Sequence, residues 1–122
     1  MPNPFIHIEL QTRDLATAKA FYAALFEWRL DDIPGMKYTM VEVGEGTGGG
    51  MMQVKEPKLS SQWIPFIQVD DVHGTTERVR TLGGTILQGP AEIPGYGWYG
   101  VVADPTGATF GIWKRETTRD AA

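Results

Sequence analysis

The sequence contains no cysteine. Disulfide bonds, thiolate nucleophiles and cysteine-ligated zinc or iron–sulfur sites are therefore excluded. The chain also lacks an apolar run of about 18 residues, which is the shortest stretch that predicts a membrane-spanning helix. Its N-terminus shows no charged segment followed by an apolar leader. These absences favour a cytoplasmic protein that does not associate with a membrane.

Positive charge is scarce as well. Eleven lysines and arginines stand against fifteen aspartates and glutamates, which gives a formal net charge of −4 at pH 7. Proteins that bind nucleic acid carry clustered positive charge that meets the phosphate backbone. We therefore expect no nucleic-acid partner.

Glycine and proline, by contrast, are abundant, with fifteen and eight residues among 122. Such a composition is typical of a turn-rich β or α+β protein and argues against a helical bundle. The length suits one domain with a substantial core. We expect a single domain over residues 1–116, and a polar tail over residues 115–122.

The N-terminal part of the chain has the pattern of a strand followed by a capped helix. Apolar and polar residues alternate from Ile6 to Gln11, which predicts a strand with two different faces. Asp14 then occupies the position of a helix N-cap. Apolar residues follow at helical spacing and predict a stripe that packs on the sheet: Leu15, Ala18, Tyr22, Leu25 and Phe26.

The same order returns in the second half. A shift of 57 residues (71 − 14) places Asp14 on Asp71, Tyr22 on Val79 and Leu25 on Leu82. Gly83 and Gly84 then end the second helix in the manner of a left-handed C-cap. Each half continues with β-like segments separated by turns, one of them the glycine-rich stretch 44–50. The sequence thus predicts two βαβββ modules, over residues 4–57 and 62–114.

This arrangement resembles the vicinal oxygen chelate superfamily, which includes glyoxalase I, extradiol dioxygenases and bleomycin-resistance proteins. The resemblance rests on several strings in order: Glu9-Leu10-x-Thr12-x-Asp14, Ala20-Phe21-Tyr22-x-x-Leu25-Phe26-x-Trp28, and Asp104-Pro105-x-Gly107-Ala108-x-Phe110-Gly111-Ile112-Trp113. It implies an α+β fold in which two tandem modules form a curved mixed sheet around a cup-shaped cavity.

The resemblance also implies where a metal ion would be bound. Metal-dependent members take ligands from the first and last strand of each module, so that a substrate can chelate the ion. Those positions here carry His7, Ile64 and Gly111, with Val54 as the repeat mate of Gly111. Only His7 has a metal-binding side chain. We therefore expect no metal and no other cofactor, while Glu56 stays open as a loop carboxylate that could complete a site with His7.

The same face of the sheet is expected to form a ligand-binding cup. His7 and Glu9 would be its polar points, and a carboxylate on an inward face is costly to bury unpaired. The apolar and aromatic lining predicted by strand alternation suits a small organic molecule. Its members are Met52, Val54, Ile64, Phe66, Gly111 and Trp113, with Trp98 and Tyr99 at the rim or, alternatively, in edge-strand packing.

Three classes of function are compatible with these features. The first is a protein that binds a small organic ligand without metal. The second is a metal-independent enzyme that uses His7 and Glu9 as an acid–base pair on a small metabolite. The third, a metal-dependent lyase or dioxygenase, is disfavoured by the missing ligands. Exposed edge strands and the resemblance together predict a homodimer.

Overall fold

The computed structural model describes residues 3–55 and 60–116, which fall into two compact units. The first, called here the N-terminal unit, comprises Ile6–Pro65. The second, the C-terminal unit, begins at Phe66 and includes the residues up to Phe5. Within the described residues, no helix is long and apolar enough to cross a membrane.

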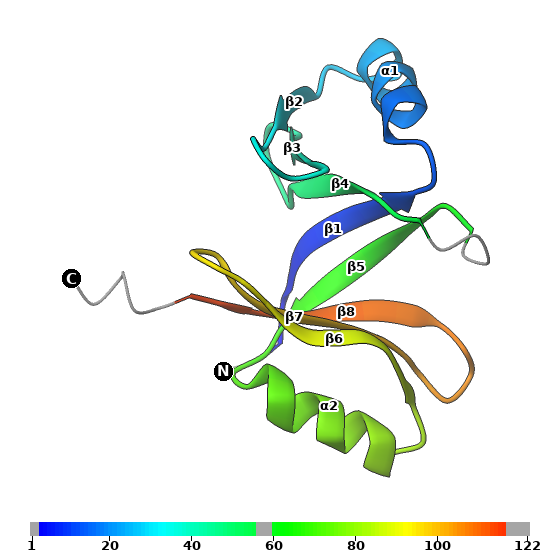
Figure 1. Ribbon diagram of the computed structural model, residues 1–122, viewed down its shortest axis with the longest axis vertical. Coiled ribbons are helices and arrows are strands. Elements are labelled where there is room, and N and C mark those ends of the chain that lie inside the picture. The colour runs from blue at the N-terminus through cyan, green and yellow to red at the C-terminus, as the bar shows by residue number, and fades with distance from the viewer. Residues whose placement is uncertain (1–2, 56–59, 117–122) are drawn as a thin grey trace. The chain divides into compact units, whose positions relative to one another are not determined.

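The N-terminal unit consists of a helix and a sheet with the strand order β2-β3-β4-β1. Strands β1 and β4 are parallel, whereas β3 pairs with β2 and β4 in antiparallel fashion. Strand β5 (Gln62–Gln68) begins in this unit and ends in the other. The remaining elements, coloured blue to green in Figure 1, are β1 (Phe5–Thr12), α1 (Leu15–Leu25), β2 (Arg29–Asp32), β3 (Tyr38–Glu42) and β4 (Gly49–Gln53).

Helix α1 begins as the sequence predicts. The Asp14 side chain accepts hydrogen bonds from the backbone nitrogen of Thr17 at 3.1 Å and from its hydroxyl at 2.7 Å, which satisfies a donor of the first turn. The helix lies on a core of Leu10, Val41 and Met51. Each fully buried apolar side chain of this size contributes about 1.5–3 kcal/mol.

The predicted apolar stripe of α1 is only partly correct. Leu15, Ala18 and Tyr22 pack against the core, but Leu25 is 56% exposed and Phe26 is 44% exposed. The reason is that the helix ends at Leu25, and the backbone of Phe26 is already extended. The stripe therefore stops one turn earlier than helical spacing suggests.

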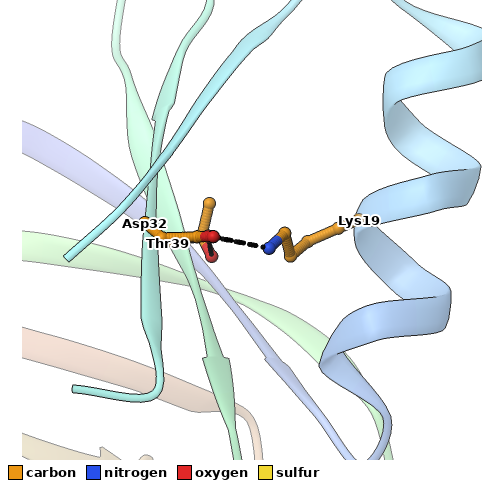
Figure 2. A network of polar contacts seen from close by, with 3 residues as sticks. All are labelled: Lys19, Asp32 and Thr39. Atoms are coloured by element: carbon orange, nitrogen blue, oxygen red, sulfur yellow. Dashed lines mark hydrogen bonds and ion pairs between the residues drawn. The ribbon is translucent and has the colours of Figure 1, made fainter. Parts of the chain in front are cut away.

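A polar contact ties α1 to the outer strands of its sheet. The Lys19 ammonium donates to both carboxylate oxygens of Asp32, at 2.8 and 3.0 Å. The hydroxyl of Thr39, which is fully buried, donates to the same carboxylate at 2.7 Å. Figure 2 shows the three side chains, with Lys19 reaching from α1 to Asp32. These two donors lower the pKa of Asp32 below its usual range. The contact joins α1, β2 and β3.

The C-terminal unit repeats this architecture. Its strand order is β5-β8-β7-β6, with β5 parallel to β8 and the other neighbours antiparallel. Helix α2 lies on a core of Val69, Val72 and Ile112. The elements after β5 are α2 (Val72–Thr81), β6 (Thr85–Ile93), β7 (Gly97–Ala103) and β8 (Thr109–Arg115).

The sequence predicted an N-cap at Asp71 and a left-handed glycine at the end of α2, and only the second is fully confirmed. Gly83 has a φ of +93°, which confirms the left-handed stop. Asp71 stands at the N-cap, but its side chain makes no capping hydrogen bond. Leu82, expected in the apolar stripe, is 66% exposed because it is the C-cap residue rather than part of the helix.

The order β-α-β-β-β therefore occurs twice along the chain, and its strands are both parallel and antiparallel. This confirms the α+β class and the tandem modules predicted from the repeat.

Candidate functional site

One face of the N-terminal sheet carries α1, and the opposite face carries the polar side chains of β1. Leu10 belongs to the core under the helix, so its neighbours Glu9 and Gln11 point the other way, as does His7. Register places Gly50 beside Glu9 and Met52 beside Gln11, with Tyr38 beside Met52 on the next strand. We call this side, defined by His7, Glu9, Gln11, Tyr38, Met40, Gly50 and Met52, the polar face.

The polar face is organised by hydrogen bonds to one buried carboxylate. The Tyr38 hydroxyl donates to Oε1 of Glu9 at 3.0 Å, and Nε2 of Gln11 donates to Oε2 at 2.9 Å. Nε2 of His7 lies 2.7 Å from the same tyrosine oxygen. When Glu9 is charged and accepts the hydroxyl hydrogen of Tyr38, the tyrosine oxygen accepts from Nε2 of His7 in the tautomer that is protonated there.

Burial shifts the pKa of every titratable member of this network. Glu9 is only 7% exposed, and burial raises the pKa of its carboxyl although the hydrogen bonds from Gln11 and Tyr38 act in the opposite direction. Burial raises the pKa of the Tyr38 hydroxyl, and the charge of Glu9 adds to the rise. Burial lowers the pKa of His7. All three shifts favour the uncharged forms.

Tyr38 reaches Glu9 only because a glycine stands between them. Tyr38 is on β3 and Glu9 on β1, so the tyrosine side chain crosses β4 above Gly50. A Cβ atom at Gly50 would overlap the hydroxyl and the ring of Tyr38. Gly50 was expected in a glycine-rich turn, but it is a buried residue inside β4. A glycine within a strand often marks such a close approach.

Sequence reasoning missed Tyr38 as a member of the site. The alternation of β1 identifies His7 and Glu9, but it carries no information about which residue of another strand faces them. Gly50 is the signal that was available, since a glycine inside a strand often marks the close approach of another group.

The strand register corrects one assignment made from the repeat. Glu9 and Phe66 are repeat mates at the shift of 57 residues, and they pair with Gly50 and Gly111 respectively. The repeat mate of Gly111 is therefore Gly50, not Val54. The shift grows to 61 residues (111 − 50) in the last strand because the strands of the second module are longer than those of the first.

The residues at the family's metal positions do not fit a metal ion. With this correction they are His7, Gly50, Ile64 and Gly111, and only His7 has a side chain that coordinates metal. Across residues 3–55 and 60–116, no three histidine, aspartate or glutamate side chains gather in a group suited to a metal. Glu56, the carboxylate left open above, lies outside the described residues.

The space beside Gly111 is filled by an aromatic ring. Phe66 pairs with Gly111 in register and is 3% exposed. A Cβ atom at Gly111 would overlap the Phe66 ring. In the C-terminal unit the position that would carry a metal ligand is therefore covered by Phe66.

The two rim aromatics predicted for the C-terminal unit point in opposite directions. Tyr99 stands beside Trp113 in register between β7 and β8. Trp98 instead packs against the core under α2, where its ring lies 4.7 Å from that of His73. Both belong to β7 and not to a loop, so consecutive residues alternate between faces. Glu92 lies in β6 opposite Trp98.

The remaining predicted contacts lie in the N-terminal unit. Met52 is half-buried on the polar face, next to Tyr38 in register. Val54 follows β4 directly and is half-buried, while Ile64 of β5 is 1% exposed. Of these, only Met52 is placed by strand register beside Tyr38 and Gln11.

The fold and the pattern along the chain match a known family. Residues 5–112 fit the model of the Glyoxalase/Bleomycin resistance protein/Dioxygenase superfamily. The chain belongs to this family. The resemblance seen in the sequence strings is thereby confirmed.

Two curated relatives are similar over most of the chain. The protein named "Putative glyoxylase CFP32" of Mycobacterium bovis is 32% identical over 109 residues, which cover 87% of this chain and 42% of the relative. The anthracycline biosynthesis protein DnrV of Streptomyces peucetius is 28% identical, covering 88% of this chain and 45% of the relative. The chain thus spans less than half the length of these relatives.

Among solved structures, methylmalonyl-CoA epimerase from Mycobacterium tuberculosis has a similar fold. The TM-score is 0.66 and the sequence identity 15%, and the match covers 97% of this chain and 91% of the epimerase. At this identity the likeness concerns the fold alone.

Proposed function

We propose that this chain binds a small organic molecule on the polar face without using a metal ion. The observation that carries the proposal is the closed network in which Tyr38 and Gln11 hold both oxygens of Glu9, and His7 is bonded to Tyr38. Such a network fixes the orientation of His7 in advance, which lowers the entropic cost of binding. The half-buried imidazole supplies a polar contact, while Met40 and Met52 supply adaptable apolar contacts.

The names of the curated relatives support this class of ligand. One is named a glyoxylase and the other an anthracycline biosynthesis protein, and both names refer to small organic molecules. Similarity at 32% and 28% identity does not transfer a substrate, so the proposal is limited to the class.

A metal-independent acid–base enzyme is the alternative, and the opposite pKa shifts of Glu9 and His7 favour it. Burial raises the pKa of Glu9 and lowers that of His7, which brings an acid and a base toward a common range. In this alternative, Glu9 would exchange a proton with a ligand through Tyr38 and His7. Against it, both oxygens of Glu9 are already occupied by donors from Tyr38 and Gln11.

Ligand binding and turnover distinguish the two functions. A library of small carbonyl and aromatic compounds is screened by thermal shift, and hits are titrated by calorimetry against the wild type, His7→Ala and Glu9→Ala. A binding protein loses affinity in both variants and converts no hit. An enzyme loses turnover in both variants and largely keeps affinity. The matched control is His73→Ala, which changes the second histidine of the chain, located on α2.

We also propose that the chain forms a homodimer. The curated relatives are more than twice as long as the aligned region, so they have room for a second domain of this size. Two copies of this chain would together provide two domains of this size. Light scattering after gel filtration is expected to give twice the chain mass of 13.5 kDa, and a monomer at micromolar concentration would contradict the dimer.

A further inference from the structure

The N-terminal unit contains an apolar pocket on the side of the sheet that carries α1. Its volume is ≈ 180 Å³. No side chain of the polar face takes part in it. The residues that line it are Ile8, Trp28, Val41, Val43, Thr47, Gly48, Gly49 and Trp63.

Two tryptophans form the walls of this pocket. The ring centroids of Trp28 and Trp63 lie 6.0 Å apart and the ring planes make an angle of 79°. Tyr22 holds both in place, since its hydroxyl accepts a hydrogen bond from Nε1 of Trp63 at 3.1 Å and its ring stacks on Trp28 at 5.8 Å. Trp63 is 37% exposed, so one indole borders the opening.

Two glycines, Gly48 and Gly49, contribute backbone to the lining of the pocket. A Cβ atom at Gly49 would overlap the carbonyl of Ile8, and one at Gly48 would lie 3.1 Å from the carbonyl oxygen of Val41. The rest of the lining is aliphatic, apart from the hydroxyl of Thr47, and it includes no charged side chain. A charged ligand would find no partner here and would lose its hydration.

The size and the chemistry of the pocket define its ligand. An apolar cavity of about 150 Å³ binds benzene, whereas pockets for drug-sized molecules start at about 300 Å³. Perpendicular aromatic rings also offer edge and face contacts to a third ring. We propose that this pocket is a second binding site, which takes an uncharged flat aromatic molecule of one or two rings. It is independent of the function proposed for the polar face.

The test uses 4-fluorotoluene as the ligand and the tryptophan indole resonances as reporters. The chain has four tryptophans, and their Nε1–H signals in a ¹⁵N-labelled sample are assigned by replacing each with phenylalanine. Addition of 4-fluorotoluene is expected to shift the signals of Trp28 and Trp63 saturably, and to leave those of Trp98 and Trp113 unchanged. Shifts confined to Trp98 or Trp113, or no shift up to the solubility limit, would overturn the proposal.

Variants that fill the pocket make the test specific. Val43→Phe places a ring inside it, and Thr47→Phe covers it from an exposed position. Each is expected to raise the dissociation constant at least about tenfold. Leu87→Phe, at a 47% exposed position of β6, is the matched control and is expected to bind as the wild type does. A thermal melt of each variant establishes that it is folded.

Two further outcomes would also overturn the proposal. If binding survives in both folded pocket variants but is lost in His7→Ala, the ligand occupies the polar face instead. If the Trp28 and Trp63 signals change with protein concentration and not with 4-fluorotoluene, the pocket is a contact between copies of the chain. Failure of the proposed function on the polar face would leave the expected indole shifts unchanged.

Discussion

Tyr38 donates its hydroxyl hydrogen to Glu9 across strand β4, at an oxygen–oxygen distance of 3.0 Å. This bond joins residues from two strands that are not neighbours, and the same hydroxyl lies 2.7 Å from Nε2 of His7. Both oxygens of the buried Glu9 carboxylate accept a hydrogen bond, because Gln11 donates to the second oxygen. The organisation of the polar face depends on this single tyrosine hydroxyl.

Tyr38→Phe is expected to destabilise the chain by about 1–3 kcal/mol, because it removes a donor from a buried carboxylate. Urea unfolding followed by circular dichroism measures the change in the free energy of unfolding. Tyr96→Phe, at a 52% exposed position, is the matched control and is expected to stay within about 0.5 kcal/mol of the wild type. Equal effects of the two changes would show that Glu9 does not depend on Tyr38.

Gly50→Ala is expected to displace the Tyr38 ring and to destabilise the chain by about 1–3 kcal/mol through overpacking. In the background of Tyr38→Ala the same change is expected to cost much less, because the overlapping side chain is gone. The four variants of this cycle are compared by urea unfolding. Gly100→Ala is a suitable control, since a Cβ atom there would have its nearest neighbour at 3.4 Å. Additive effects would contradict the crossing of β4 by Tyr38.

The raised pKa of Glu9 predicts a specific dependence of stability on pH. At pH values directly above 4.5, the ordinary value for glutamate, the native chain binds more protons at Glu9 than the unfolded chain does. The Glu9 contribution to stability therefore falls as the pH rises through this window. His7 acts in the opposite direction, since its lowered pKa lets stability rise as the pH approaches 6.5.

Comparison with Glu9→Gln isolates the Glu9 contribution, because this variant keeps the shape and removes only one titration. The free energy of unfolding of the wild type minus that of Glu9→Gln is expected to decrease as the pH rises above 4.5. Urea unfolding at a series of pH values measures it. A difference that increases with pH would mean that Glu9 is stabilised in its charged form.

Gly111→Ala tests whether Phe66 occupies the position of the absent ligand. A Cβ atom at residue 111 would overlap the Phe66 ring, so we expect destabilisation by about 1–3 kcal/mol. Phe66→Leu leaves more room beside residue 111 and is expected to reduce the cost of Gly111→Ala. Thermal or urea unfolding of the four variants measures the coupling. If Gly111→Ala destabilises the Phe66→Leu variant as much as the wild type, the Phe66 ring does not lie beside residue 111.

The parts of the fold that depend on local chemistry were predictable from the sequence. The alternation from Ile6 to Gln11 predicted β1 and its two faces, and Asp14 predicted the start of α1. Both features are determined by residues within a few positions of each other. The end of α1 was less predictable, because Phe26 continues the helical spacing although the helix ends at Leu25.

The arrangement of the candidate site was not predictable in the same way. Contact between Tyr38 and Glu9 depends on the register of three strands, and the connection between β3 and β4 sets the register of only that pair. One residue of difference would turn Tyr38 to the other face. For the same reason Trp98 and Tyr99, which are adjacent in sequence, separate to opposite sides of β7.

Metal content tests the central claim most directly. Protein purified without a histidine tag is analysed by inductively coupled plasma mass spectrometry, and thermal shift is recorded on addition of Ni²⁺, Zn²⁺, Mn²⁺ or Fe²⁺. An ion that binds only the native chain must raise the melting temperature. Metal-free binding on the polar face predicts no stoichiometric metal and no shift, in the wild type and in His7→Ala alike. A stoichiometric metal that is lost in His7→Ala would contradict it.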